Sequence, residues 1–261
     1  MVSFTSTELN VLIAGFLWPL TRILGLIATA PLFGNLSIPV RVKIGLGVML
    51  ALVIAPTVPA MPAADPMSLA GALILVQQLV IGLAMGFAMR IVFAAVEMAG
   101  EISGLTMGFG FATFFDPQTR GRSSAISQFL ALLALMIFLA LNIHLVLLAT
   151  LADSFMSMPI SGVPGGVQSF HDVANWGGLI FTAGVQLSLP IVATLLITNI
   201  ALGVLTRAAP QLNLFGIGFP ITLGAGFVVL ALVLPYLATP LEKLFQEGIG
   251  VVRQITIPGA H

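Results

Sequence analysis

The sequence predicts an all-α membrane protein, and three observations support that prediction. Hydrophobic residues make up 59% of the 261 residues, whereas charged residues make up only 7%. In soluble proteins roughly a quarter of the residues are charged. The mean hydropathy of this chain is +1.14. The apolar residues also gather in long runs, each able to cross a hydrocarbon core about 30 Å thick as a helix. A bundle of apolar helices is therefore the expected architecture.

About six apolar runs are long enough to be helical spans. In chain order they are Leu9–Gly34, Ile44–Ala60, Leu69–Val96, Ala125–Ala152, Leu179–Leu205 and Leu214–Thr239. The first is not expected to be a cleaved signal peptide, because Glu8 precedes it and Arg22 interrupts it. Prolines lie inside three of the runs, at Pro19, Pro190 and Pro235, where a lost backbone hydrogen bond predicts a kink or a broken helix. We therefore expect kinked or broken helices rather than straight spans.

Charged residues in the connections alternate in sign along the chain. The basic connections carry Arg41 and Lys43, Arg120 and Arg122, and Arg207, and the acidic ones carry Asp65, Asp153 and Asp172. Connections rich in lysine and arginine stay on the cytoplasmic side of a membrane. The pattern therefore predicts that both chain termini lie on the outer face.

Composition and motifs exclude several classes of function. The formal net charge of +0 and the lack of a basic run argue against nucleic acid as a partner. The sequence has no cysteine, and its three histidines are far apart, so neither a thiolate site nor a metal site is expected. Because no nucleotide-binding, G-x-S-x-G or paired-histidine motif occurs, we expect neither an enzyme nor a bound cofactor. A secondary transporter or channel for a small solute is the alternative, although no internal repeat supports it.

The stretch from Gly100 to Pro117 is the most informative segment of the chain. It places several glycines and phenylalanines between two long apolar spans. Glycine permits close approach and positive φ, and the phenylalanines are too apolar for a solvated loop. We therefore predict a loop packed inside a membrane assembly, either as a movable plug or as a tight interhelical turn. The candidate loop residues are Gly108, Phe109, Gly110, Phe111, Thr113, Phe114, Phe115, Asp116 and Pro117.

Arg90, Glu97 and Glu101 form a second candidate group. At helical spacing the three side chains align on one face, with the two carboxylates one turn apart. Because an unpaired charge inside a membrane costs at least about 2.5 kcal/mol, we expect these carboxylates to meet cations of a neighbouring subunit or to take up a proton. The alternative is that they face water or headgroups at a helix end. Arg22, inside the first span, is expected to snorkel or to pair with a neighbour.

The chain also divides into two unequal parts, residues 1–170 and 171–261. A stretch rich in glycine, proline and serine, Ser157–Gly166, follows the fourth span and shows no helical period. Beyond it the sequence predicts one helical hairpin, in which a proline breaks the helix and polar side chains satisfy the freed backbone groups. The candidate residues of the hairpin turn are Arg207, Pro210, Gln211, Asn213, Gly218 and Pro220.

Three segments taken together resemble the FliR family of flagellar biosynthesis proteins and its virulence-system relatives. They are Ala30–Gly34 with Ile38–Gly45, then Gly108–Pro117, then Arg207–Asn213 with Gly218 and Pro220. Their order and spacing match the family over nearly the whole chain. The resemblance implies a core subunit of the type III secretion export gate, forming part of the channel through which unfolded flagellar proteins cross the inner membrane.

The resemblance also implies partners and an internal organisation. FliR-type chains join FliP-type and FliQ-type subunits in a helical, conical assembly at the centre of the flagellar basal body, with an FlhB-type protein at its entrance. In such a hetero-oligomer the apolar spans would be kinked hairpins packed on neighbouring subunits. Residues 1–170 would correspond to a FliP-like portion, and residues 171–261 to a FliQ-like hairpin. The loop from Gly108 to Pro117 would then close the channel until an export substrate arrives.

Overall fold

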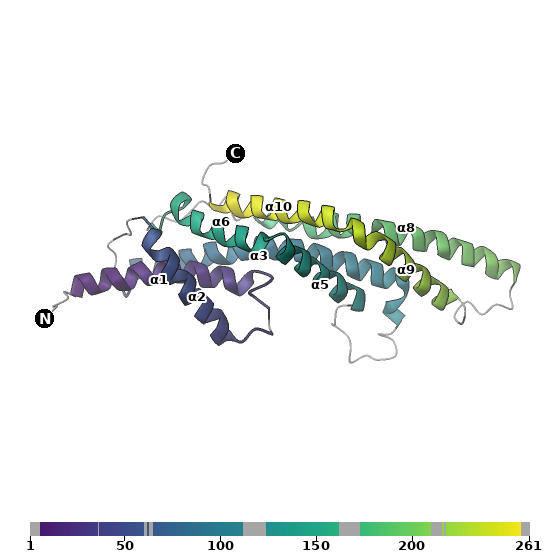
Figure 1. Cartoon of the computed structure of the whole chain (residues 1–261), viewed down its shortest axis with the longest axis horizontal. Coiled ribbons are helices and arrows are strands. Elements are labelled where there is room, and N and C mark those ends of the chain that lie inside the picture. The colour runs from purple at the N-terminus through teal and green to yellow at the C-terminus, as the bar shows by residue number, and fades with distance from the viewer. Residues whose placement is uncertain are drawn as a thin grey trace. The chain divides into compact units, whose positions relative to one another are not determined.

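The computed structural model describes residues 6–35, 37–59, 62, 65–111, 124–161, 173–209, 216 and 218–256. The regular secondary structure in these ranges is helical, which confirms the all-α prediction (Figure 1). The α-helices are α1 (Ser6–Thr29), α2 (Val40–Ile54), α3 (Leu69–Met107), α5 (Ala125–Ala140), α6 (Ile143–Ser157), α8 (Leu179–Ala208), α9 (Phe219–Val233) and α10 (Ala238–Thr256). Short 3₁₀ turns follow α2, α3 and α9: η1 (Ala55–Thr57), η2 (Phe109–Phe111) and η5 (Leu234–Tyr236).

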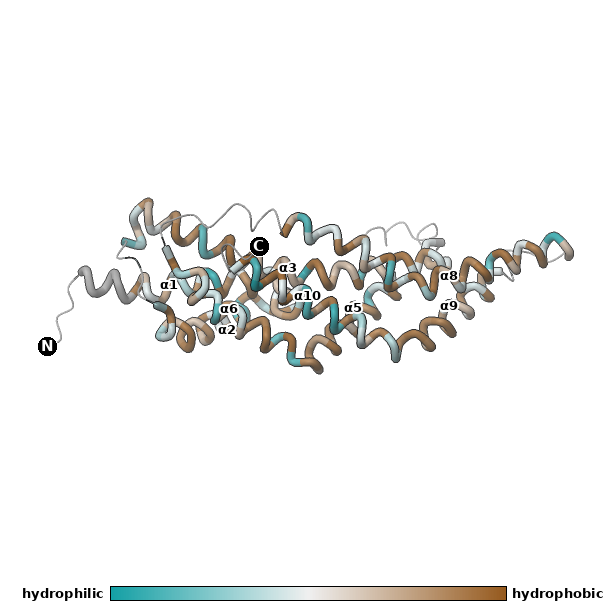
Figure 2. The backbone as a smooth tube through the Cα atoms, turned by 90° about the horizontal axis from the view of Figure 1, so that it is seen from above, coloured by the Kyte–Doolittle hydropathy of each residue, from teal (hydrophilic) through white to brown (hydrophobic). Residues whose placement is uncertain are grey.

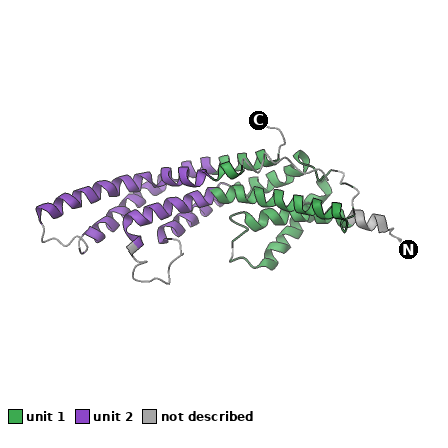
Figure 3. Ribbon diagram, turned by 180° about the vertical axis from the view of Figure 1, so that it is seen from behind, with its two compact units in different colours: residues 1–91, 142–177, 245–261 green, residues 92–141, 178–244 purple. Residues whose placement is uncertain are grey.

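The chain forms two compact units, coloured separately in Figure 3. The first unit comprises residues 1–91, 142–177 and 245–261, and the second comprises residues 92–141 and 178–244. Each unit therefore takes segments from both sides of the predicted division near residue 170. The predicted division says which part of the chain resembles a FliP-type subunit and which part resembles a FliQ-type subunit. The compact units do not test that resemblance, so the division stays a prediction.

The structure corrects the number of membrane spans from about six to four or five. Within the described residues, four helices are long and apolar enough to cross a membrane, namely Val40–Thr57, Leu69–Met107, Val173–Ala208 and Phe219–Tyr236. The predicted fourth span is broken between α5 and α6, because Asn142 adopts a left-handed conformation with a φ of 56°. Counting α5 and α6 as one broken span gives five. The described apolar part of α1, Ile13–Thr29, is shorter than these spans.

The prolines inside the predicted spans affect their helices differently. Pro19 and Pro190 lie inside α1 and α8, and both helices continue past them. Pro235 lies in η5, the 3₁₀ turn between α9 and α10. Because proline has no amide hydrogen to donate to the preceding turn, α9 ends there in the tighter helix. The break expected at Pro235 is confirmed, whereas no break occurs at the other two prolines.

Within the first unit, α1 and α3 cross at two glycines of α3. A side chain on Gly82 would collide with the backbone oxygen of Arg22, and one on Gly86 would collide with Thr29 Oγ1. The Thr29 hydroxyl also donates a hydrogen bond across the crossing to Leu83 O, at 3.1 Å. Small residues four positions apart let helix backbones approach closely in membrane proteins. The crossing is therefore a backbone contact that larger residues would separate.

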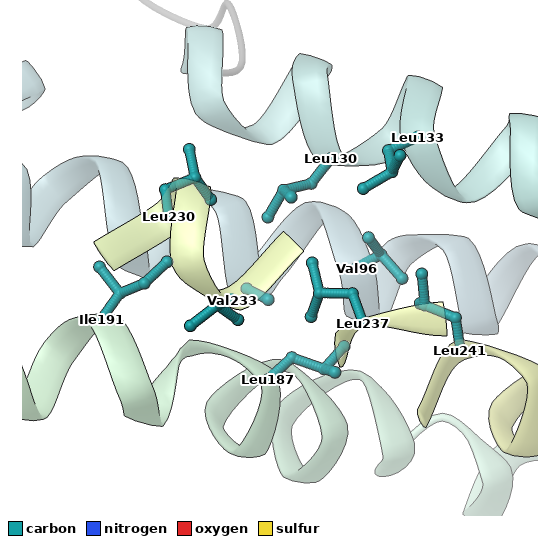
Figure 4. A pocket seen from close by; sticks show the side chains of 10 residues that line it. Val96, Leu130, Leu133, Leu187, Ile191, Leu230, Val233, Leu237 and Leu241 are labelled. Atoms are coloured by element: carbon teal, nitrogen blue, oxygen red, sulfur yellow. The ribbon is translucent and has the colours of Figure 1, made fainter. Parts of the chain in front are cut away.

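The second unit packs the part of α3 after Ile91 with α5, α8, α9 and the first turn of α10. Side chains from these helices point toward one another around an apolar cavity of about 10 Å³ (Figure 4). A water molecule needs about this much space and also needs polar partners, which an aliphatic wall does not offer. The cavity is thus an imperfection of packing and not a site for a solute. Its lining includes Val96, Leu130, Leu187, Ile191, Leu230 and Leu237.

Helix α10 follows the last predicted span and is amphipathic rather than apolar. In Figure 2 its trace alternates between hydrophilic and hydrophobic residues, whereas α8 and α9 are mostly hydrophobic. Residues three and four positions apart line its buried face, namely Leu241, Leu244, Phe245, Ile249, Val252 and Ile255. Its exposed face carries Lys243, Gln246, Glu247, Arg253 and Gln254. This 3.6-residue period is readable in the sequence, but a search for long apolar runs misses it because of the charges.

Candidate functional site

The candidate loop begins at the C-terminal end of α3. The helix runs to Met107, so the glycine-rich stretch from Gly100 is helical at first, and only Gly108 leaves the helix, with a φ of 98°. Such a φ favours glycine strongly over other residues. The next residue, Phe109, starts η2, and its ring packs edge-on against Phe227 with the ring centroids 6.2 Å apart. The loop candidates Thr113, Phe114, Phe115, Asp116 and Pro117 lie outside the described residues.

Helix α9 packs against the start of this loop. A Cβ added to Gly108 would lie 2.9 Å from the ring of Phe219, the first residue of α9. Further along α9, a Cβ added to Gly226 would lie 2.6 Å from the side chain of Met107. The C-terminal hairpin therefore supports the described beginning of the loop, where α3 ends.

Helices α3 and α5 hold the base of the loop. Glu101 Oε1 of α3 accepts a hydrogen bond from the backbone N–H of Ser124 at 2.7 Å. Ser124 is the N-cap of α5, and its Oγ accepts from the N–H of Ser127 at 3.1 Å. The Ser127 hydroxyl in turn donates to the backbone oxygen of Glu97 at 2.9 Å. The Ser124 hydroxyl also donates to Gly100 O of α3 at 3.4 Å, so four hydrogen bonds fix the first turn of α5, three of them directly to α3.

Two glycines of α3 make this approach possible. A side chain on Gly100 would collide with the backbone of Ser127, and a Cβ on Gly104 would lie 2.8 Å from Ser124 Oγ. Both glycines are helical, so their role is to let α5 approach rather than to form a turn. The sequence prediction of close backbone approach is confirmed here, although the element is a helix and not a loop.

The charged group predicted on one helical face lies on α3 as expected. Arg90 is exposed, and Glu97 and Glu101 are half-buried. The Glu101 carboxylate has a partner inside the chain, the N-terminal end of α5, where the positive end of the helix dipole favours an anion. The predicted contact of these three residues with another subunit stays a prediction.

Helices α8 and α9 form the predicted C-terminal hairpin and contact each other. Arg207 lies in the last turn of α8, where a cation stabilises the negative end of a helix. Gly218 precedes α9, and Pro220 lies in its first turn, where a missing amide costs nothing because that amide has no acceptor within the helix. The turn candidates Pro210, Gln211 and Asn213 lie outside the described residues.

Of the two alternatives expected for Arg22, pairing with neighbours is confirmed, because the side chain is completely buried and does not snorkel. The sequence interpretation did not identify its partners, which form the Arg22 cluster. Its Nε donates to Gln78 Oε1 at 2.8 Å. Its Nη1 donates to Ser154 O at 2.9 Å and to Ser154 Oγ at 3.0 Å, and its Nη2 donates to Met158 O at 3.0 Å. The guanidinium carbon also lies 4.3 Å from the centroid of the Phe155 ring, a cation–π contact. Arg22 therefore joins α1, α3 and the end of α6.

The Arg22 cluster stabilises a helix end through carbonyl groups of the described residues. Ser154 and Met158 carry carbonyls at the C-terminus of α6, where the negative end of the helix dipole favours a cation. The cluster carries a cost, because in the described residues Gln78 Nε2 is buried with no hydrogen-bond partner. The signal available in the sequence was the occurrence of Arg22, Gln78 and Ser154 as polar residues inside apolar runs.

Arg22 and Glu101 both bond to backbone groups at helix ends. Arg22 donates to carbonyls, and Glu101 accepts from an amide. In the ranges that the structure describes, no group of three or more His, Asp or Glu side chains could hold a metal ion. The arrangement can fix helix ends and set the base of a loop.

Comparison with known proteins gives the family. Residues 13–248 match the family described as bacterial export proteins, family 1. The chain is 44% identical over 255 residues to the flagellar biosynthetic protein FliR of Pectobacterium carotovorum subsp. carotovorum, which covers 98% of this chain and 97% of the relative. It is 43% identical over 240 residues to FliR of Escherichia coli strain K12, with 92% of both chains covered. It is 30% identical over 247 residues to FliR of Bacillus subtilis strain 168, with 94% and 95% covered. The chain therefore belongs to the FliR family of bacterial export proteins.

Proposed function

We propose that this chain is a core subunit of the flagellar type III export gate and forms part of the channel for unfolded flagellar proteins in the bacterial inner membrane. Family membership over nearly the whole chain is the observation that carries the proposal. The apolar helices agree with a membrane location, since at least four are long enough to cross a bilayer within the described residues. No reaction is proposed, because a gate lets its substrate pass without changing its covalent structure.

Exposed apolar side chains support a function in a hetero-oligomer. Several large apolar residues of α8 are 60–68% exposed, namely Phe181, Leu196, Ile197, Ile200 and Val204. Large apolar side chains exposed to this degree on an apolar helix need lipid or another chain to cover them. FliP-type and FliQ-type subunits and an FlhB-type protein, assembled in the flagellar basal body, are the proposed partners. Arg90, Glu97 and Glu101 are proposed to lie at one of these subunit interfaces.

The two-part organisation belongs to the same proposal. Residues 1–170 would take the place of a FliP-type subunit, and residues 171–261 that of a FliQ-type hairpin. The contact between α8 and α9 supports the second half of this proposal, because it forms the expected antiparallel pair of apolar helices. The likeness would let one chain continue a spiral of separate subunits.

The loop from Gly108 to Pro117 is proposed to close the channel at rest. Sealing by apolar side chains needs no strong bonds, because an apolar constriction loses its continuous water path and then blocks ions. The positive φ at Gly108 supports a role as the point where the segment leaves α3. Transient contact with unfolded export substrates would displace the loop.

Copurification separates this proposal from the transporter alternative. Expressed with FliP-type and FliQ-type partners and extracted in mild detergent, the chain should elute with them as one complex. Expressed alone, it should aggregate or be degraded, and deletion of its gene should abolish flagella and secretion. A monodisperse chain that moves a small solute without partners would contradict the proposal.

A further inference from the structure

We infer that Glu101 is a positioning residue for the Gly108–Pro117 loop, because its carboxylate caps the N-terminus of α5 and so fixes the base of the loop against α3. The inference rests on the proposed function of the loop. It assigns to Glu101 a task inside the chain, in addition to any contact with a neighbouring subunit.

The first turn of α5 needs an acceptor that its own sequence does not supply. In a capping box, the N-cap hydroxyl accepts from the third helical residue, and a glutamate at that third position accepts from the N-cap amide. In α5 the N-cap is Ser124 and the third helical residue is Ser127, which sends its hydroxyl to Glu97 O instead. The N–H of Ser124 is satisfied by Glu101 of α3, at 2.7 Å. The capping box is therefore completed by another helix.

Charge and packing strengthen this bond. A carboxylate that accepts from an amide at a helix N-terminus makes a charge-assisted hydrogen bond and meets the positive end of the helix dipole. Glu101 is half-buried, and the contacts at Gly100 and Gly104 keep α5 close enough for the bond to form. Losing the carboxylate would free the Ser124 amide while the helix contact further along α5 persists.

The consequence concerns the loop and not the core. The loop begins just after α3 ends at Met107, and the next described residue after the loop is Ser124, the N-cap of α5. Glu101 ties this residue to α3, the helix from which the loop starts. Without that bond the first turn of α5 opens more often, and the resting position of the loop becomes less defined.

The test uses the complete complex with its partner subunits, reconstituted in vesicles. E101A should speed amide exchange in the first turn of α5 roughly tenfold, the size expected for one charge-assisted hydrogen bond, and should raise the ion conductance of the closed complex. E101Q keeps an acceptor oxygen without the charge, so its effects should be smaller. T106V is the matched control, because the Thr106 hydroxyl lies near the end of α3 but bonds only to Ile102 O and Ser103 O of its own helix.

Two variants of Ser124 isolate the hydrogen bond itself. S124A keeps the backbone amide, and S124P removes it, while the observed φ of −58° suits proline. If Glu101 acts through this amide, E101A should add little to S124P but should add its full effect to S124A. Complex yield, measured for each variant, separates failure to assemble from a change in gating.

The outcomes distinguish the positioning role from the proposed function of the loop. Faster exchange together with higher conductance in E101A, both absent in T106V, supports the positioning role. Unchanged exchange in E101A overturns it. Faster exchange without extra conductance also overturns it, provided that a shortened loop does leak, since Glu101 is then a structural cap only. If neither E101A nor the shortened loop leaks, the proposed closure by the loop fails, and the positioning role fails with it.

Discussion

Each of the two compact units contains a charged side chain that caps a helix to which it does not belong. In the first unit Arg22 of α1 donates to the carbonyls at the C-terminus of α6, and in the second unit Glu101 of α3 accepts from the amide at the N-terminus of α5. Each charge has the sign that the helix dipole favours. The same physical device thus serves both units.

The two caps differ in burial and in what adjoins them. Arg22 is completely buried, and the groups around it accept four hydrogen bonds from its guanidinium. Glu101 is half-buried, with one hydrogen bond to the first residue described after the loop. A buried cap with many bonds fixes a core, whereas an accessible cap with one bond can be released at small cost. The comparison predicts that Arg22 determines stability and Glu101 determines the behaviour of the loop.

The largest expected effect is that of Arg22→Ala. Removing the guanidinium leaves the side-chain oxygen of Gln78 and the C-terminal carbonyls of α6 buried without their donor, and we expect a loss of roughly 3–5 kcal/mol of stability. Arg22→Lys should recover part of the loss, because an ammonium group keeps the charge but cannot bridge these acceptors as a planar guanidinium does. Thermal unfolding of the purified complex in detergent measures both variants. Arg41→Ala, at an exposed position, is the control, and an equal loss there would contradict the comparison.

The next effect is that of enlarging the glycine at the α1–α3 crossing. Gly82→Ala would push a methyl group against the backbone of Arg22 and should destabilise the first unit by about 1–3 kcal/mol. Gly45→Ala in α2 meets open space, so it should stabilise the helix by up to about 1 kcal/mol. The two glycine-to-alanine substitutions should therefore change the free energy of unfolding in opposite directions, which unfolding measurements can show. If both destabilise equally, backbone approach at Gly82 is not what holds the crossing.

In the second unit, removing the N-cap hydroxyl of α5 should cost less stability than the changes in the first unit. Ser124→Ala removes the hydroxyl that caps Ser127, and we expect a cost of about 1 kcal/mol, the usual value for an N-cap. The backbone bond to Glu101 persists in this variant, so the loop should stay closed. Unfolding and conductance measured on the same preparation check the two statements together. A large leak without a loss of stability would show that the hydroxyl, not the carboxylate, sets the loop.

The smallest change in stability is expected for the loop itself. If Phe111, Phe114 and Phe115 seal a channel rather than pack a helix core, converting all three to serine should leave the unfolding temperature nearly unchanged. The conductance of vesicles containing the assembled complex should nevertheless rise, because a polar constriction stays wet. A large drop in stability with no leak would make the loop a packing element and remove the contrast between the two units.

Local chemistry made part of this fold predictable. Long apolar runs gave the helical class, because a chain in lipid must satisfy its backbone within each span. The break at Pro235 followed from the missing amide, and the match of three segments to the FliR family located the loop near Gly108 and the hairpin turn near Arg207. The amphipathic period of α10 can also be read from its own sequence, although a search for long apolar runs misses this helix because it contains charged residues.

Tertiary structure decided what the same residues do. A glycine permits both a turn and a close helix contact, so only the structure shows that α3 continues to Met107 and that α5 packs against Gly100 and Gly104. A lone arginine in an apolar run has no assigned partner until distant segments meet it, and Gln78, Ser154 and Met158 are far from Arg22 in sequence. The sequence by itself therefore determined the class, the family and the helix-forming segments. The structure determined which charges cap which helices, because hydrogen bonds between distant segments depend on packing that no local pattern records.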